Sequence, residues 1–223
     1  MQELVLPLFP LPNVVHFPST ELSLHIFEPR YREMVAELLE RPEEERRIGM
    51  ILAGNPAPGG ACELLEPGCA GRLVAHEALE DGRSNIVLLG EFRFRIAREI
   101  EGRPYRRVGA MPLEESFPLI EAERAELLER EIVKLAIAVA GESCPRFPVD
   151  LSALAGLGRP GHLLPLINRL AAGLDLPPLR KQMLLAEPPL ERAEQVAGIL
   201  RSRLKLLASL RPFRHLGGDP GSN

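Results

Sequence analysis

The sequence predicts an α+β protein in which a strand-rich first half with one inserted helix is followed by a helical second half. Two observations indicate this fold class. Up to about residue 116 the apolar residues alternate with polar ones or occur in short runs, and beyond it they recur at helical spacing. Hydrophobic residues make up 45% of the 223-residue chain, which is enough for a sizeable buried core.

Short apolar segments predict the strands of the first half, and segments rich in Pro, Gly and charged residues predict the loops between them. The predicted strands are Leu4 to Phe9, Leu22 to Phe27, Ile48 to Leu52, Leu73 to Leu79, Ile86 to Leu89 and Phe92 to Ile100. The predicted loops are 42–45, 55–60, 66–68, 80–85 and 101–104. Residues 1–115 are therefore expected to form a β lobe.

One helix is predicted inside this lobe. Pro29 is favourable at a first helical position after Glu28, and the apolar residues that follow recur at helical spacing. These residues are Tyr31, Met34, Val35, Leu38 and Leu39. The helix is expected to end near Arg41, before Pro42.

Helical spacing dominates residues 116–212, which we predict to form a helical lobe. One face of a helix of about six turns is formed by Leu128, Ile132, Leu135 and Val139. Further helices are expected at about 161–173, 177–186 and 190–211. The last has an apolar stripe formed by Ala193, Val196, Ala197, Leu200, Leu204, Leu207 and Ala208. Residues 213–223 are expected to be a flexible tail.

The composition excludes several classes of protein. Lys and Arg number 27 against 31 Asp and Glu, so the net charge of -4 argues against a general nucleic-acid binder. The amino terminus has no basic segment, and prolines interrupt its apolar run, so we expect neither a signal peptide nor contact with a membrane. We expect a cytoplasmic protein whose cysteines, Cys62, Cys69 and Cys144, are reduced thiols.

No motif in the sequence predicts catalysis. A P-loop ATPase needs a Gly-Lys-Ser/Thr segment to hold phosphates, and the chain contains no Gly-Lys dipeptide. The segment HEALE at 76–80 resembles the HExxH zinc motif, but Glu80 stands at the position of the second histidine. We therefore predict no catalytic residue, no metal ion and no cofactor.

Histidines and lysines are the remaining candidates for acid or base chemistry. His16 and His25 lie in apolar segments, where a histidine can act as a perturbed acid or base. No Asp, Cys or Ser constellation accompanies them, so we expect hydrogen-bonded structural histidines. The lysines are expected on solvated helix faces: Lys134, Lys181 and Lys205.

Residues 92–107, FRFRIAREIEGRPYRR, combine arginines with aromatic residues and allow two interpretations. One is a surface for single-stranded nucleic acid. The other is a strand whose apolar side chains point to the core and whose arginines point to solvent. The apolar set is Phe92, Phe94 and Ile96, and the arginines are Arg93 and Arg95. The strict alternation favours the second interpretation.

Three separated segments resemble one protein family. LPLFPLPNVVHFPSTELSLHIFEPRYREMV at 6–35 is similar to its signature block, and DGRSNIVLLGEFRFRI at 81–96 is similar to its central hairpin. LPPLRKQMLLAEPPLERAEQV at 176–196 is similar to its helical ending. The chain thereby resembles the Lon amino-terminal (substrate-binding) domain family. The resemblance implies a PUA-like β pseudo-barrel lobe followed by an α-helical bundle lobe.

The resemblance also implies a binding role. In the proteases of this family the domain helps to engage unfolded or tagged polypeptides, and it is followed by an ATPase module and a Ser-Lys peptidase module. Because this chain stops at residue 223, we expect a stand-alone, non-enzymatic polypeptide-binding protein of protein quality control. Its expected partners are unfolded or tagged polypeptide and a full-length Lon protease. RNA binding by the PUA-like lobe is the alternative.

The predicted peptide-binding residues lie where a strand is followed by a helix. They are Phe27, Glu28, Arg30 and Tyr31. We expect a groove at this position that binds its ligand by shape and apolar contact, because exposed aromatic side chains and sheet edges are what extended peptides bind. The competing interpretation is structural: Glu28 begins the helix, Arg30 pairs with a nearby acid and Tyr31 lies at the edge of the core.

Overall fold

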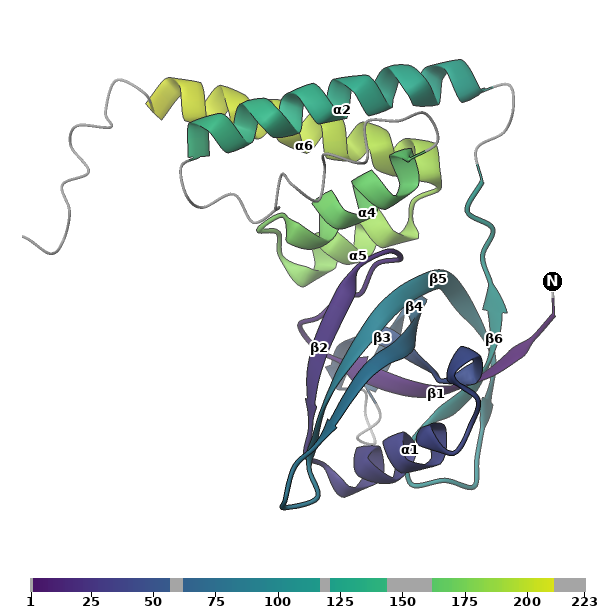
Figure 1. The fold of residues 1–223 in the computed structure, drawn as a ribbon. Helices are drawn as coiled ribbons and strands as arrows, with labels where there is room; N and C mark the ends of the chain where they lie inside the picture. The colour runs from purple at the N-terminus through teal and green to yellow at the C-terminus, as the bar shows by residue number, and fades with distance from the viewer. Residues whose placement is uncertain (1, 57–61, 117–120, 144–161, 211–223) are drawn as a thin grey trace, which may run out of the picture. The chain divides into compact units, whose positions relative to one another are not determined.

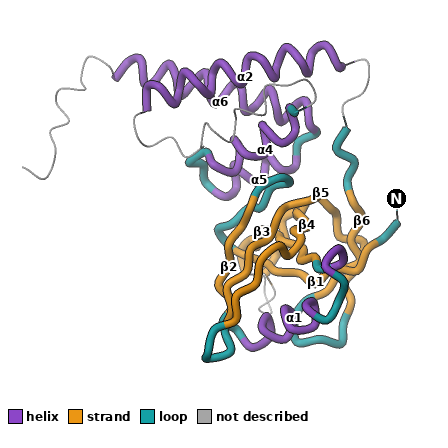
Figure 2. Tube along the Cα trace, viewed as in Figure 1, coloured by secondary structure: helices purple, strands orange, loops and turns teal. Residues whose placement is uncertain are grey.

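The computed structural model describes residues 2–56, 62–116, 121–143 and 162–210. Cys144 and the expected tail, 213–223, lie outside these residues. The chain divides into two compact units, Met1–Ser116 with Ala171–Pro188, and Phe117–Leu170 with Pro189–Asn223. The expected fold class is confirmed: strands with one inserted helix come first, and helices follow (Figures 1 and 2).

The first unit contains a sheet of six strands. They are β1 (Leu4–Leu11), β2 (Glu21–Ile26), β3 (Arg47–Pro56), β4 (Cys62–Ala78), β5 (Ser84–Ile100) and β6 (Arg107–Pro112). Their order is β2-β5-β4-β3-β1-β6, and β5 also pairs with β6. This last pairing closes β5, β4, β3, β1 and β6 into a pseudo-barrel and leaves β2 outside the closure (Figure 1). The β1–β3 pair is parallel, and the other pairs are antiparallel.

Strand β5 pairs with three neighbours, β4, β2 and β6, because it is long enough to bend. Its first part, from Ser84 to Leu89, pairs with β2, and its second part, from Phe94 to Ile100, pairs with β6. The Phe94 ring fills the barrel interior above two glycines. A Cβ atom at Gly68 would lie 2.5 Å from this ring and one at Gly49 2.9 Å, so both positions need the small residue.

Three of the predictions for the strands are wrong. The strands expected at 86–89 and 92–100 are one continuous strand, β5. Residues 66–68 were expected to form a loop, but they lie within β4. The β3–β4 register shifts between Met50 and Leu52, opposite this segment, so the sheet accommodates it as an irregularity and continues. Strand β6 is absent from the predicted set, because its buried residues include the small Gly109 and Ala110 and give only a weak apolar pattern.

The inserted helix is confirmed as α1 (Pro29–Leu39). Its apolar face is buried against strand residues that include Ile26, Ile48 and Leu88. This face consists of Tyr31, Met34, Val35 and Leu38. The predicted loop at 42–45 contains a short 3-10 helix, η1 (Glu43–Glu45).

Residues 171–188 group with the strands, whereas helical spacing alone places them in the helical lobe. They include helix α5 (Pro178–Ala186). The Gln182 amide nitrogen donates hydrogen bonds to the carbonyls of Leu65 (2.9 Å) and Pro67 (3.0 Å) on β4. Side-chain bonds to strand backbone therefore attach this helix to the sheet.

Arg93 makes the second attachment, and its predicted orientation toward solvent is wrong. The side chain is only 4% exposed and forms an ion pair with Glu115. Its Nη1 donates to the carbonyls of Leu185 (2.7 Å) and Glu187 (2.8 Å) at the end of α5. Carbonyls at a helix C-terminus lack intrahelical partners and have partial negative charge, so a buried guanidinium satisfies them. Its neighbour Arg95 is exposed, as predicted.

The second unit contains α2 (Ala122–Ser143), α6 (Pro189–Leu210) and most of α4 (Leu163–Gly173). Ion pairs join Arg124 to Glu194 and Glu131 to Arg201. Both pairs have a sequence separation of 70 residues, so α2 and α6 run parallel. Their facing residues form a buried seam.

The predicted apolar faces of these helices are partly correct. Leu128, Ile132 and Val139 are buried in α2, but Ala136 takes the buried place expected for Leu135. The α6 stripe is buried only as far as Leu200, and its later members, Leu204, Leu207 and Ala208, are half-buried or exposed. A fully buried arginine, Arg192, was not predicted; it donates to the Asn168 side-chain oxygen at 2.6 Å.

Candidate functional site

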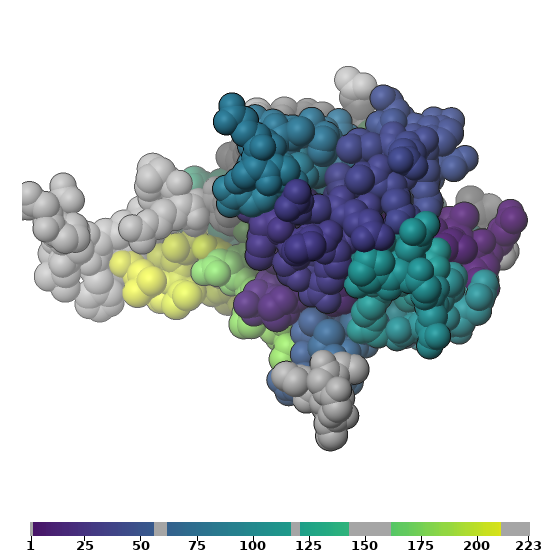
Figure 3. All heavy atoms as spheres, turned by 90° about the horizontal axis from the view of Figure 1, so that it is seen from below, coloured from purple at the N-terminus to yellow at the C-terminus, as the bar shows by residue number. Residues whose placement is uncertain are grey.

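The predicted peptide-binding residues lie at the junction of β2 and α1. Phe27 follows β2 and is 59% exposed, and its ring lies 6.2 Å from that of His25. Glu28 precedes α1 in an extended backbone conformation and accepts a hydrogen bond from Arg30 Nε at 2.9 Å. Helix α1 itself forms part of the molecular surface (Figure 3). Three of the four predicted side chains are thus accessible to a ligand.

Tyr31 differs from the other three because its ring belongs to the core. It is 5% exposed and stacks on Phe9 with ring centroids 4.0 Å apart. The Arg30 guanidinium covers it at 4.6 Å from the ring centroid. Burial raises the pKa of its hydroxyl above the ordinary 10.0. These contacts fit the structural interpretation of Tyr31, since little of the ring is left for a ligand.

Strand β2 has one free edge. Among the strands in the described part of the chain it pairs only with β5, from Glu21 opposite Leu89 to Ile26 opposite Ser84. Alternate residues of an edge strand direct their N–H and C=O groups away from the sheet. The strand contains neither proline nor lysine, the residues that commonly block such an edge. The edge can therefore accept another strand.

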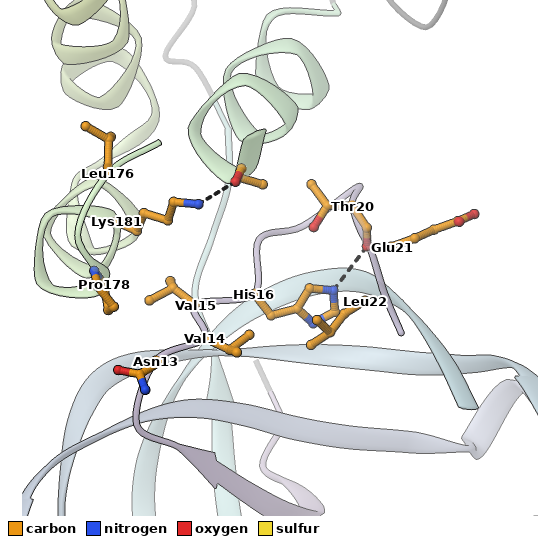
Figure 4. A pocket seen from close by; sticks show the side chains of 11 residues that line it. Asn13, Val14, Val15, His16, Thr20, Glu21, Leu22, Leu176, Pro178 and Lys181 are labelled. Atoms are coloured by element: carbon orange, nitrogen blue, oxygen red, sulfur yellow. Dashed lines mark hydrogen bonds between the residues drawn. The ribbon is translucent and has the colours of Figure 1, made fainter. Parts of the chain in front are cut away.

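A cavity of about 350 Å³ adjoins the N-terminal end of β2. Its walls come from the loop before β2, from the start of β2 and from the segment around α5, all within the strand-rich unit. The apolar lining includes Val14, Val15, Leu22 and Leu176 (Figure 4). The Glu21 carboxylate points away from the cavity in this view. The cavity has the size and lining to hold an apolar side chain of a ligand.

His16 supports the cavity wall. It is buried, and its Nε2 lies 3.1 Å from the Thr20 carbonyl, to which it donates. Burial lowers the pKa of its imidazole below the ordinary 6.5, so the ring is neutral near pH 7. The prediction of a structural histidine is confirmed for His16. His25 is hydrogen-bonded to the Asn85 side chain at 2.8 Å, but it is exposed, so the predicted apolar surroundings are wrong.

Lys181 closes another side of the cavity, and the prediction of a solvated side chain is wrong for it. The ammonium group donates to the Ala172 carbonyl at 2.6 Å, near the end of α4. Burial lowers the pKa of this amine below its ordinary value. The other two lysines, Lys134 and Lys205, are exposed as predicted. Sequence spacing gave no sign of this contact, because it depends on how two helices meet.

A second cavity, of about 250 Å³, has a mixed polar and apolar lining, and its two arginines already have partners. Arg46 donates to the carbonyls of Arg41 and Leu39, and Arg72 forms an ion pair with Glu91. This cavity therefore has fewer polar groups available to a ligand than its lining suggests.

Most of the arginines of residues 92–107 form ion pairs. Arg98 pairs with Glu3, Arg103 with Glu37 and Arg106 with Glu99. Arg107 donates to the Glu101 carbonyl. Because the phosphate backbone is bound chiefly by unpaired cations, this segment offers a weak surface for nucleic acid.

The described residues contain neither a cluster of metal-ligating side chains nor a helix that could cross a membrane. No three His, Cys, Asp or Glu side chains there are grouped so that they could hold a metal ion. The segment at 76–80 begins at the end of β4 and is not helical. Within the same ranges no helix combines the length and apolar character needed to cross a membrane.

Comparisons with known proteins agree with this architecture. The N-terminal domain of Mycobacterium avium complex Lon protease superposes with a TM-score of 0.66 at 13% identity, covering 90% of this chain and 98% of that one. A Lon N-terminal domain protein from Xanthomonas campestris superposes with a TM-score of 0.55 at 23% identity, covering 87% and 98%. At these identities the likeness establishes the fold.

Sequence relatives cover most of the chain. Lon protease of Anaeromyxobacter dehalogenans is 28% identical over 209 residues, which are 92% of this chain and 23% of the relative. Lon protease 2 of Myxococcus xanthus is 27% identical over 213 residues, which are 91% and 24%. The chain therefore spans about a quarter of the length of these relatives. The family model of the ATP-dependent protease La (LON) substrate-binding domain matches residues 5–202, and the chain belongs to this family.

Proposed function

We propose that this protein binds extended polypeptide along the free edge of β2 and holds one apolar side chain of the ligand in the adjoining cavity. The observation that supports this most is the position of the cavity at one end of β2, a strand that pairs along one edge only among the described strands. Edge pairing supplies main-chain hydrogen bonds for any sequence, and a pocket beside the edge supplies side-chain selectivity. The family description, a substrate-binding domain, agrees with a polypeptide ligand.

The proposed ligand extends along β2 from the cavity to Phe27. Thr20 and Leu22 lie at the cavity, and the exposed ring of Phe27 lies at the other end of β2. A strand of about six residues spans roughly 20 Å, so a short extended segment reaches both. Glu28 and Arg30 flank the far end of the path. In this proposal Phe27, Glu28 and Arg30 contact the ligand, and Tyr31 supports them from the core.

The expected affinity is modest. Pairing of about six residues and burial of one side chain supply the binding free energy, and the entropy lost when the ligand becomes ordered reduces it. We therefore expect a Kd of about 1 μM or weaker, near -8 kcal/mol. Six of the eleven residues that line the cavity are apolar, the Lys181 ammonium already donates to a backbone carbonyl, and the net charge is only -4. Salt should therefore change the affinity little.

This function would place the protein in protein quality control, with unfolded or tagged chains as ligands and a full-length Lon protease as a further partner. We propose binding without catalysis. The RNA-binding alternative has less support, because most of the arginines that suggested it form ion pairs with acids.

A matched pair of variants tests the proposed site. Leu176 lines the cavity, whereas Leu179 lies on α5, is 63% exposed and does not line it. With a reduced and alkylated unfolded polypeptide as ligand, Leu176→Ser should weaken binding about tenfold and Leu179→Ser should leave it unchanged. Equal effects of both variants, or a loss of most affinity in high salt, would contradict the proposal. Thermal melts check that both variants remain folded.

A further inference from the structure

The free edge of β2 is self-complementary. Its sequence, ELSLHI, has an acid at position 21 and a histidine at position 25, symmetrically placed about Ser23. In an antiparallel pairing of two copies centred on Ser23, Glu21 of each copy lies opposite His25 of the other, and Leu22 lies opposite Leu24. Residues directly opposite on antiparallel strands face the same side of the sheet and interact.

We propose that a second copy of this chain docks on the β2 edge in this register, forming a twofold-symmetric dimer with a continuous sheet. A symmetric interface needs one patch that complements itself, and this edge fulfils that condition. Glu21, Ser23 and His25 are all exposed, so they are available to a partner. The half-buried Leu22 and Leu24 extend the apolar face from one copy to the next.

The charges favour this register over its neighbours. His25 Nε2 lies 3.5 Å from Arg83 Nη1, so an incoming Glu21 carboxylate meets a guanidinium as well as an imidazole. Arg83 also pairs with Asp81, which leaves the local cluster near neutral before the partner's acid arrives. Centring the pairing on Leu24 instead would place Glu21 opposite Phe27, and centring it on Leu22 would place it opposite Ser23. Of these three registers, only the one centred on Ser23 places Glu21 of each copy opposite His25 of the other.

This dimer would occupy the edge that the polypeptide uses. The dimer would then block the edge of β2, and unfolded polypeptide would bind there by displacing the second copy. The competition rests on the proposed function, whereas the self-pairing stands on the complementarity of the strand alone.

Cysteine crosslinking tests the register directly. Opposite residues on antiparallel strands have Cβ atoms about 5 Å apart, so Ser23→Cys places two thiols across the twofold axis within reach of a disulfide. Glu21→Cys is the matched control, because its two copies would lie about 14 Å apart along the strands, beyond disulfide reach. Under mild oxidation we expect a covalent dimer for Ser23→Cys at least tenfold more abundant than for Glu21→Cys or the unsubstituted chain. Equal crosslinking of the two variants, or none, would overturn the proposal.

Charge exchange provides a second measurement by analytical ultracentrifugation. His25→Glu places two acids opposite each other and should weaken self-association about tenfold, and adding Glu21→Lys should restore it. His76→Glu, which changes an exposed histidine of β4, should have no effect. Failure of the double variant to restore the dimer would contradict the register.

The same samples separate the two proposals. Unfolded polypeptide should decrease the Ser23→Cys crosslink severalfold when added before the oxidant. Crosslinking that polypeptide does not reduce would support the dimer and contradict polypeptide binding at this edge. Polypeptide binding without any crosslink would support the proposed function and overturn the dimer.

Discussion

Arg93 shows how one side chain can connect two distant parts of the sequence. Its guanidinium bonds the last carbonyls of α5 and pairs with Glu115 while almost fully buried. Replacing it with leucine removes these buried hydrogen bonds and the ion pair, so Arg93→Leu should lower the free energy of unfolding by about 3 kcal/mol. Urea denaturation measures the change. Arg95→Leu, at the exposed neighbouring position, is the control, and a loss of similar size there would contradict the assigned role.

His16 predicts a pH dependence of stability. Burial lowers the pKa of the folded imidazole below 6.5, so below about pH 6.5 the unfolded chain binds a proton that the folded protein does not. The contribution of His16 to the free energy of unfolding is therefore fully present above about pH 6.5 and decreases as the pH falls below it. His16→Gln retains a donor for the Thr20 carbonyl but does not titrate.

We therefore expect the loss of unfolding free energy between pH 7.5 and 5.5 to be smaller in His16→Gln than in the unsubstituted protein, by up to roughly 1 kcal/mol. Urea titrations at the two pH values measure this difference. His76→Gln changes an exposed histidine and should retain the full pH dependence. The same pH dependence in all three proteins would show that His16 is not responsible.

At the scale of elements, the stability that α2 contributes should come mainly from its buried face. Ile132 is fully buried, whereas Ile137 on the same helix is 56% exposed. Ile132→Ala removes buried methyl groups and should destabilise the helical unit by about 3 kcal/mol, and Ile137→Ala should cost less than about 0.5 kcal/mol. Urea unfolding followed by helical circular dichroism tests the contrast. Comparable losses would mean that the exposed face of α2 is covered in solution.

The elements that sequence could predict are those with a strong local pattern. Helix α1 follows from Pro29 and the spacing of Tyr31 and Leu38, and α6 follows from its apolar stripe. Strand β6 could not be predicted because small residues weaken its alternation. The segment 66–68 could not be predicted because a register shift with β3, a contact between strands, keeps it in the sheet.

The site was harder to predict than the fold for the same reason. Local sequence identified the exposed Phe27 and the helix start at Glu28. It did not identify the cavity, because Val15 and Leu176 meet only after 160 residues of intervening chain have folded. Nor did it identify Arg93 as buried, since its partners on α5 are 92 and 94 residues away. Contacts of this kind have no signature in a short segment.

At the scale of the strand-rich unit, the position of β5 explains why a binding edge exists. By pairing with β6 as well as β4, β5 closes the barrel without β2. Strand β2 is then fixed along one side by β5 and open along the other. The attachment of residues 171–188 to the sheet adds Leu176 and Lys181 to the cavity beside that edge. Barrel closure and helix attachment together produce the proposed site.

Residue-resolved amide hydrogen exchange tests the proposed polypeptide site most directly. Amides of Glu21–Ile26 that face away from β5 should exchange rapidly in dilute protein. With saturating unfolded polypeptide they should become at least tenfold slower, while amides on the exposed face of α2 should not change. Unchanged exchange along β2 under conditions where the polypeptide is bound, or protection confined to another part of the chain, would contradict binding at this edge.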